Sequence, residues 1–512
     1  MLALLDWVIL AMSVALVLGI GAMVGRRRSR AMLQADQEGA EKAFFLASGR
    51  MPWWAVSASV VATSLSAVTF IGGPESSYNG NMTFLAATIG MIFGVLIVGI
   101  LFVPAYYKHG VTTVYELLGI RFGIGAQRVA SGAFLIGRVM ASGVRLYVGS
   151  IAFSLAVLGD LSSENMIYSI LAVALIACVY TSMGGIAAVV WTDVAQLLIL
   201  LGAAGAAIVL LLREIPADVP AIVEALRSAK QPDGTSKLTL FDWRWDLTSN
   251  WSIPTVICGW TLFNVAAYGT DQDLAQRLLT CKDAARGRAA IIGAGLVGTV
   301  VTGVFMILGL LLFVRHQQPE LMGDAIAASV PEGRQVFLEY ALGSLPIGVR
   351  GMLLAGLFAA ALSSLDSALN AMASATVRDF GFGEGGGAQR VARASRIAVI
   401  GWAIALAVFA IGAVRWTAAN PETDLVDLAL GIMIYAYSGL LGVFFAALLT
   451  KRGNGVSAIA ALITGFVVTW ALGQEQIVHI SISGGWRMLF ATTAAFLVCI
   501  SAYPVPEGTT DG

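Results

Sequence analysis

The chain has 512 residues, of which 58% are hydrophobic and only 12% charged, and its formal net charge is zero. Its mean hydropathy is +0.82. Apolar runs of about 20 residues, the length that crosses a bilayer, recur from end to end and leave no room for a separate soluble domain. The composition therefore predicts one all-α integral membrane domain over residues 1–512. It argues against a nucleic-acid partner, because no basic run with interleaved aromatic residues is present.

The apolar runs predict about thirteen transmembrane helices, in contact with membrane lipid. Their approximate ranges are 2–24, 51–79, 82–106, 125–158, 163–182, 186–212, 251–277, 289–314, 350–378, 393–414, 425–449, 455–472 and 485–503. The first run is too long for a cleaved signal peptide, so we interpret it as a retained helix. With an external amino terminus, the inner loops carry most of the 31 basic residues. The positive-inside rule thus predicts a multi-pass protein of the plasma (inner) membrane with a cytoplasmic carboxyl terminus.

Neither a metal centre nor a disulfide framework is indicated. The chain has four cysteines and three histidines, and none of them has the spacing of metal ligands. All three histidines are near expected loops, so no span contains the histidine that would help to build an acid-base site. We therefore expect a protein that is not an enzyme. A relative that binds a solute as a sensor, without transport, remains an alternative.

One apolar segment carries a stripe of polar side chains. The sequence GLFAAALSSLDSALNAMASA covers residues 356–375. On a helix, positions 360, 363, 367 and 370 share one face, which brings oxygen atoms together. A carboxylate in mid-membrane costs about 2.5 to 3.5 kcal/mol and needs a partner, and an oxygen-rich stripe suits a hard cation. The alternative is that small and hydroxyl side chains only pack helices together. The polar residues are Ser363, Ser364, Asp366, Ser367 and Asn370.

Two of the expected spans are predicted to be broken. In the second, ASVVATSLSAVTFIGGP (58–74) has hydroxyl residues in mid-crossing and ends in Gly72, Gly73 and Pro74. In the seventh, FNVAAYGTDQDLAQR (263–277) brings polar residues such as Asp271 and Asp273 into one crossing. Unwound helices are tolerated at membrane depth where the freed carbonyls line a cavity, and a matching pair in two halves points to a transporter binding site. A glycine-softened kink without a ligand is the alternative.

These broken spans define the expected organisation of the chain. The two halves would be a first core repeat over residues 51–212 and a second core repeat over residues 251–449. Residues 1–24 and 455–503 would form peripheral helices.

Three segments together resemble the sodium:solute symporter family. They are TSMGGIAAVVWTDVAQ (181–196), AALSSLDSALN (360–370) and WWAVSASVVATSLSAVTFIG (53–72). The resemblance covers most of the chain. It implies a LeuT-type fold with a 5+5 inverted-repeat core and two broken helices. It also implies a carrier, expected to work as a monomer, that uses the sodium gradient to take up a small solute.

The same resemblance implies a sodium site. Ala62, Leu65 and Ala360 would offer backbone oxygens, and Ser363 and Ser364 would offer hydroxyl oxygens. A set of neutral oxygens suits a monovalent ion, because weak binding lets the ion leave again.

A second cation site is implied less directly. In some members an aspartate at the position of Asp193 helps to hold a second cation, with hydroxyls at the positions of Asp366 and Ser367. This chain differs, because residue 366 is a carboxylate, and this difference leaves both the presence of a second ion and its identity, sodium or proton, open. The alternative is that Asp193 braces an inner gate through an arginine such as Arg378.

Two arginines within the fourth span bear on the solute. Arg138 and Arg145 are seven residues apart and lie on about the same helix face. A guanidinium is always charged and binds carboxylates with two parallel hydrogen bonds, so one that faces a central cavity suggests an anionic solute. Arg138, nearer the inner end, is expected to pair with an acidic residue or to reach the interface. Arg145 is the expected solute contact.

The expected solute pocket combines Arg145 with residues that the resemblance supplies. We expect sodium-coupled symport of a small organic anion, of sialic acid or monocarboxylate type. The alternatives are a proton-coupled carrier or exchanger of the same fold, or sodium-coupled uptake of a neutral solute such as a sugar or amino acid. Besides Arg145, the expected contacts are Ser64, Ser66, Thr69, Phe84 and Asn264.

Overall fold

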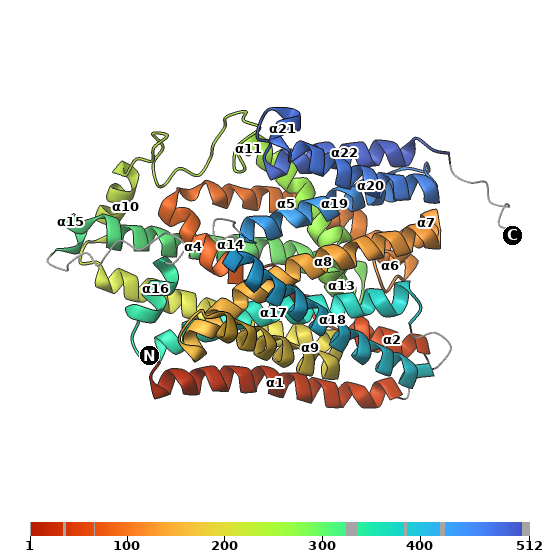
Figure 1. The fold of residues 1–512 in the computed structure, drawn as a ribbon, viewed down its shortest axis with the longest axis horizontal. Helices are drawn as coiled ribbons and strands as arrows, with labels where there is room; N and C mark the ends of the chain where they lie inside the picture. Colours follow the sequence, from red (N-terminus) through yellow and green to blue (C-terminus); the bar gives the residue numbers. More distant parts are fainter. Residues whose placement is uncertain are drawn as a thin grey trace, which may run out of the picture.

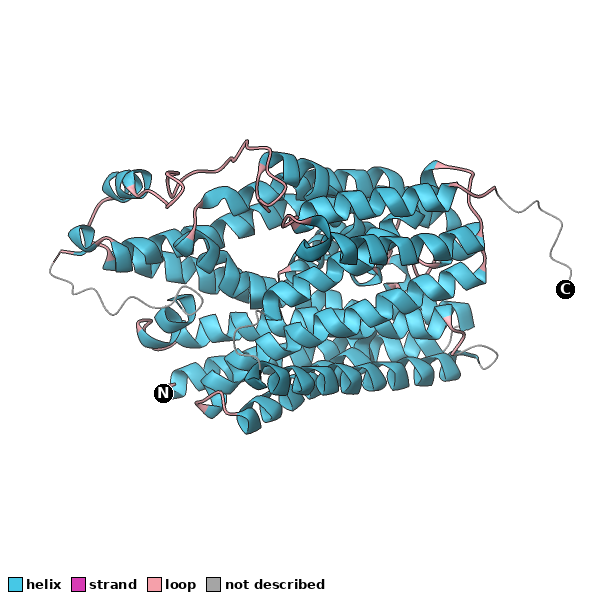
Figure 2. Ribbon diagram, turned by 45° about the horizontal axis from the view of Figure 1, so that its top comes forward, coloured by secondary structure: helices cyan, strands magenta, loops and turns pink. Residues whose placement is uncertain are grey.

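The computed structural model describes residues 2–33, 37–65, 67–323, 336–382, 387–419 and 425–503. Within these ranges the chain forms helices and no strand, apart from two isolated bridges in one long loop. Figure 2 shows the helices lying side by side in an elongated bundle, with most loops at its two ends. In the described part, nine helices are long and apolar enough to cross a membrane. The protein is thus an all-α integral membrane protein, as predicted.

The long helices form the body of the bundle. They are α1 (Leu4–Leu33), α8 (Ile124–Phe153), α9 (Ser163–Glu214), α14 (Ala284–Gln317), α17 (Val349–Asp379), α18 (Gly387–Ala419), α19 (Leu425–Leu449), α20 (Gly455–Leu472) and α22 (Gly484–Ile500).

Shorter helices complete the spans and cover the ends. They are α2 (Gln37–Phe45), η1 (Ala47–Gly49), α3 (Trp53–Ser64), α4 (Ala67–Asn79), η2 (Met82–Ala86), α5 (Ala87–Ile97), η3 (Val98–Phe102), α6 (Val103–His109), α7 (Glu116–Phe122), η4 (Ser154–Leu158), α10 (Val219–Ser228), α11 (Ile253–Thr255), η5 (Val256–Trp260), α12 (Thr261–Val265), η6 (Ala266–Thr270), α13 (Gln272–Leu278), α15 (Pro319–Met322), α16 (Val336–Gly343) and α21 (Glu475–Val478).

Helix α17 lies at the centre of the bundle (Figure 1). In its most apolar stretch 94% of the residues are buried, against 22% for α1 and 33% for α20 at the periphery. Small residues let its neighbours approach closely: a Cβ on Gly356 would lie 3.3 Å from the Cα of Leu200 on α9. The helix with the polar stripe therefore faces protein and not lipid.

The first predicted break is present between α3 and α4. Helix α3 ends at Ser64, and Leu65 has extended backbone angles (φ −82°, ψ 100°). Gly72, Gly73 and Pro74 do not interrupt the second helix, because α4 continues through Pro74 to Asn79. The turn at Pro74 is packed against α14, where a Cβ on Gly309 would lie 2.1 Å from the Pro74 carbonyl oxygen.

The second predicted break lies between η6 and α13. Two π-helical turns, η5 and η6, widen this crossing, and Asp271 then has extended backbone angles (φ −87°, ψ 120°). Turns of this kind leave backbone groups outside the regular helix pattern and are frequent at functional sites.

Two expected spans, 163–182 and 186–212, form the two arms of α9. Gly185 bends this helix with φ 56° and ψ −161°, a conformation that suits glycine. A Cβ there would also lie 2.5 Å from the carbonyl oxygen of Phe44. The two expected spans are therefore both present, and Gly185 forms the kink between them.

The first and the last described helices begin and end at opposite ends of the bundle. In Figure 1, α1 begins at the left, on the same side as α10, α15 and α16, and α22 ends at the right, on the side of α7. The arrangement agrees with termini on opposite membrane faces. That the amino terminus is external stays a prediction from the distribution of basic residues.

Candidate functional site

Asp193 joins three helices at the centre of the bundle. Its carboxylate accepts hydrogen bonds of 2.5 Å from the hydroxyls of Ser59 on α3 and Ser363 on α17. All three side chains are at most 1% exposed. The segment 181–196 and the polar stripe of α17, which are far apart in the sequence, are thus brought together.

The residues expected to hold sodium lie where α3 ends against α17. The hydroxyl of Ser364 lies 3.4 Å from the carbonyl oxygen of Thr63, and the hydroxyls of Thr63 and Ser367 are 3.2 Å apart. Because α3 ends here, carbonyls of its last turn have no regular helical partner and can serve as ligands. Such carbonyl and hydroxyl oxygens fit a hard monovalent cation. The five expected ligands, all buried, are Ala62, Leu65, Ala360, Ser363 and Ser364.

Arg277 reaches the same place, which the sequence analysis did not foresee. The expected span 251–277 ends at this arginine, but it belongs to α13 and its side chain is 0% exposed. Its Nη2 lies 3.3 Å from Oδ2 of Asp193 and donates to the hydroxyl of Ser367. Its Nε donates to the hydroxyl of Ser59 over 2.8 Å. The second break directs α13 into the bundle, and this carries Arg277 inward.

Asp193 is paired with an arginine, as the alternative reading proposed, but this arginine is not Arg378. Arg378 lies at the far end of α17, where its Nε is 2.9 Å from a carboxylate oxygen of Glu116. Four turns of helix separate it from Ser363. The arginine that braces Asp193 is Arg277.

The candidate second cation site therefore already contains a fixed positive charge. Asp193 is paired with Arg277, and Ser367 accepts from the same guanidinium. Asp366, which is fully buried, accepts a hydrogen bond of 3.0 Å from Ser367. A cation between these groups would face repulsion from Arg277 unless α13 moved.

Arg138 pairs with acidic residues, as predicted. It donates to Asp271, and its Nη1 lies 3.0 Å from Oδ2 of Asp273. The hydroxyl of Tyr437, on α19, donates to Asp271 over 2.5 Å. Asp273 also lies 3.2 Å from Nη1 of Arg277 through its other oxygen. One buried carboxylate thus bridges both arginines, which links α8 to the site around Asp193.

Arg145 is different from Arg138. It is half-buried, two turns further along α8. Within the described residues, Arg145 has no hydrogen bond or ion pair to any side chain or carbonyl. A partly buried guanidinium that lacks a direct hydrogen bond or ion pair is costly, so an anion supplied from outside the protein would be stabilised there.

The other expected solute contacts differ in the partners that their side chains already have. Ser64 donates to the carbonyl of Val61 over 2.9 Å, and Phe84 packs edge-on against Trp251 at 4.8 Å between ring centroids. Asn264 donates to the carbonyl of Trp260 over 2.7 Å, so its amide is engaged by its own helix. Ser66 lies outside the described residues, and for Thr69 only the backbone is described.

The chain is similar to known sodium-coupled transporters. The model of the sodium:solute symporter family matches residues 44–465. The sodium/sialic acid symporter SiaT of Proteus mirabilis is 26% identical, over 84% of this chain and 83% of its own length. The sodium/glucose cotransporter of Vibrio parahaemolyticus is 28% identical, over 73% and 69%. A solved structure of a Na⁺-coupled sialic acid symporter in a substrate-bound outward-open state superposes with a TM-score of 0.82 at 23% identity, and 97% of each chain is covered.

The chain belongs to the sodium:solute symporter family and has the LeuT-type fold. It is a sodium-coupled membrane transporter of an organic solute and not an enzyme.

Proposed function

We propose that this transporter takes up a small organic anion, of the sialic acid or monocarboxylate type, together with sodium. The observation that carries the proposal is the contrast between the two arginines of α8: Arg138 is neutralised by Asp271 and Asp273, whereas Arg145 has no partner among the described residues. The similarity to sodium/sialic acid symporters supports the same solute class.

The proposed solute site surrounds Arg145 near the first helix break. Arg145 would bind the carboxylate of the solute, and hydroxyl and aromatic side chains would contact its body. The proposed contacts are Ser64, Ser66, Thr69 and Phe84, with Asn264 as a more distant member, because its amide is already bonded to Trp260.

The proposed sodium ligands are Ala62, Leu65, Ala360, Ser363 and Ser364. Since α3 and α17 must meet to assemble this set, sodium would stabilise the conformation in which Ser364 lies against Thr63. Sodium binding would thereby favour the solute-binding state on the outer side, and a monomer in the inner membrane would complete transport by alternating access.

We further propose that Arg277 is the counter-charge of Asp193 in this state. Its contacts to Asp193 and Ser367 support a single-sodium cycle. A second sodium at Asp193, Asp366 and Ser367 is the alternative, and it requires α13 to withdraw.

Uptake into proteoliposomes tests the proposal. Vesicles with an inward sodium gradient should accumulate radiolabelled N-acetylneuraminate or pyruvate, and vesicles in potassium or choline medium should not. Accumulation of glucose or a neutral amino acid, with no effect of the two anions as competitors, would show that the solute is neutral instead. Equal uptake in potassium medium at an imposed proton gradient would show a proton-coupled carrier.

A further inference from the structure

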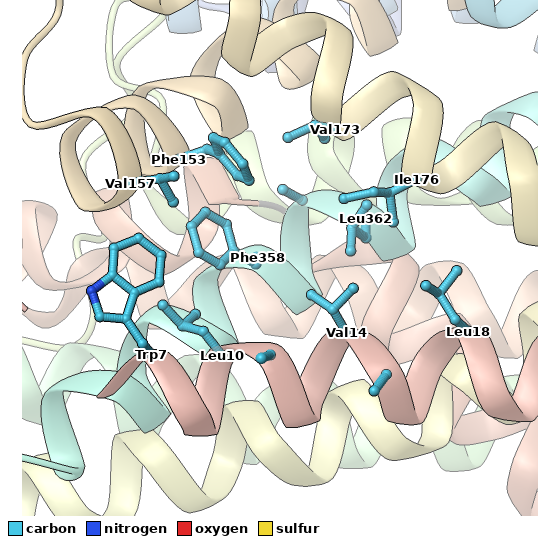
Figure 3. A pocket seen from close by; sticks show the side chains of 13 residues that line it. Trp7, Leu10, Val14, Leu18, Phe153, Val157, Val173, Ile176, Phe358 and Leu362 are labelled. Carbon is cyan, nitrogen blue, oxygen red and sulfur yellow. The ribbon is translucent and has the colours of Figure 1, made fainter. Parts of the chain in front are cut away.

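An apolar cavity of about 400 Å³ lies between α1 and the core of the transporter. Figure 3 shows α1 forming one wall, with Val14 and Leu18 directed toward side chains of α9 and α17. Phe153 and Val157, at the end of the α8 helix and in η4, close a further side. The lining side chains are apolar, apart from the indole nitrogen of Trp7. The cavity therefore offers no group that would hold water or a charged solute.

The cavity is maintained by contacts at both ends of the stretch of α1 that lines it. Near its start, the carboxylate of Asp6 accepts hydrogen bonds from the backbone N–H groups of Gly348 (2.7 Å) and Gly351 (3.0 Å). Further along, the backbone of α1 touches the bend of α9, where a Cβ on Gly184 would lie 3.2 Å from the carbonyl oxygen of Gly21. Because α1 is held at Asp6 and at Gly21, on either side of the cavity, the helix spans the cavity and does not pack into it.

The dimensions of the cavity match one leaflet of a bilayer. Along α1 it extends from Trp7 to Leu18, which is about 16 Å at the helical rise. The hydrocarbon core is about 30 Å thick, so this is about half of it. Trp7 is 39% exposed near the end of the helix, in the position where tryptophans favour the headgroup level.

The cavity is also accessible from the membrane. Ala11 and Ala15 in its wall are exposed at the surface of α1. An apolar cavity of about 150 Å³ is already large enough to bind benzene. A larger one, bordered by hydrocarbon, would be filled by the apolar chains around it.

We propose that this cavity binds one acyl chain of a membrane phospholipid, with the headgroup beside Trp7. The chain would contact Phe358, Ala361 and Leu362 on α17. These residues belong to the same turns of α17 as the proposed sodium ligands Ala360 and Ser363, so the lipid chain would contact the helix turns that bind sodium. The proposal is independent of the solute and of the number of sodium ions.

Photolabelling tests the proposal directly. The protein would be reconstituted in phosphatidylethanolamine and phosphatidylglycerol vesicles that carry a palmitoyl chain with a diazirine, illuminated, digested and analysed by mass spectrometry. We expect adducts on residues 358–362 of α17. Ala361 and Leu362 are only 6% and 4% exposed, so lipid at the outer surface cannot label them. Labelling confined to exposed residues such as Met12 and Leu16 would overturn the proposal, and so would labelling of α17 by a diazirine sterol alone.

A filled cavity provides the matched control. Val14→Trp places a large side chain in the cavity, and Leu16→Trp places the same side chain on the lipid-facing side of α1, where Leu16 is 48% exposed. The α17 adducts should disappear in Val14→Trp and persist in Leu16→Trp. Persistence in both would contradict the assigned position. Labelling needs neither solute nor an ion gradient, so a failure of the proposed transport activity would not affect the result.

Discussion

The guanidinium of Arg277 and the carboxylate of Asp193 lie 3.3 Å apart, and both side chains are completely buried. The pair joins α13, which follows the second helix break, to α9. It also fixes two hydroxyls: Ser59 donates a hydrogen bond to Asp193, and Ser367 accepts one from Arg277. The ion pair thus involves Asp193 and Ser367, two of the three residues of the candidate second cation site.

Arg277→Gln should destabilise the protein strongly. Removing one partner of a buried pair leaves the other charge uncompensated, which costs about 3 to 5 kcal/mol. Thermal unfolding in detergent would measure the loss. Arg286→Gln is the matched control, because Arg286 is 54% exposed and its nearest carboxylate is 3.8 Å away.

The double variant Arg277→Gln with Asp193→Asn tests whether Arg277 is the counter-charge of Asp193 or whether Asp193 binds a second sodium. If Arg277 is the counter-charge, neutralising both residues should recover much of the lost stability, and the sodium Hill coefficient of uptake should be about one in the parent protein. A parent coefficient above one that falls in Asp193→Asn alone would instead support a second sodium.

Ser364→Ala should raise the sodium concentration needed for half-maximal uptake. A site made of few neutral oxygens loses affinity when one is removed, while the solute contacts stay intact. Ser374→Ala is the control on the same buried helix, because Ser374 accepts only a 3.4 Å hydrogen bond from Gln272. An unchanged sodium dependence in Ser364→Ala would remove this residue from the site.

The arginines of α8 should respond differently to substitution. Arg145→Gln should abolish saturable uptake of the anion without a large change in melting temperature, because no described side chain depends on it. Arg138→Gln should lower the melting temperature, since Asp271 and Asp273 would lose their partner, yet the remaining folded protein should keep its apparent affinity for the solute. Normal anion uptake by both variants would contradict an anion site at Arg145.

Lys237 should make stability depend on pH. This loop residue is 2% exposed and donates to the carbonyls of Ser77 and Tyr78 at the end of α4. Burial lowers the pKa of its amine from 10.5 to about 8. The unfolded chain then binds more protons between these values, so the free energy of unfolding should rise as the pH increases from about 8 to 10.5. Lys237→Met should lose this rise in melting experiments from pH 7 to 10. Parallel curves of melting temperature against pH for the two proteins would rule out this role of Lys237.

Local sequence was sufficient for the features that depend on local chemistry. The breaks near Ser64 and Asp271, and the burial of the polar stripe on α17, follow from where polar residues interrupt apolar runs. That Arg138 would need an acidic partner followed from the cost of a charge in the membrane.

Features that depend on distant elements were not predictable in this way. Arg277 stands at the end of an expected span, whereas its partner Asp193 comes from α9. The role of Tyr437 in holding Asp271 likewise depends on how α19 packs against α8.

The near-complete enclosure of α17 has a consequence for biogenesis. The mean hydropathy of its best stretch is 1.7, and that of α8 is 1.3, whereas α1, α14 and α18 reach 2.5 to 2.6. A newly made segment that carries Asp366 and several hydroxyls partitions poorly into lipid by itself. We expect α8 and α17 to be retained beside the translocon until their neighbours have been synthesised, so that the most apolar helices enter the bilayer first and the transport pathway is assembled last.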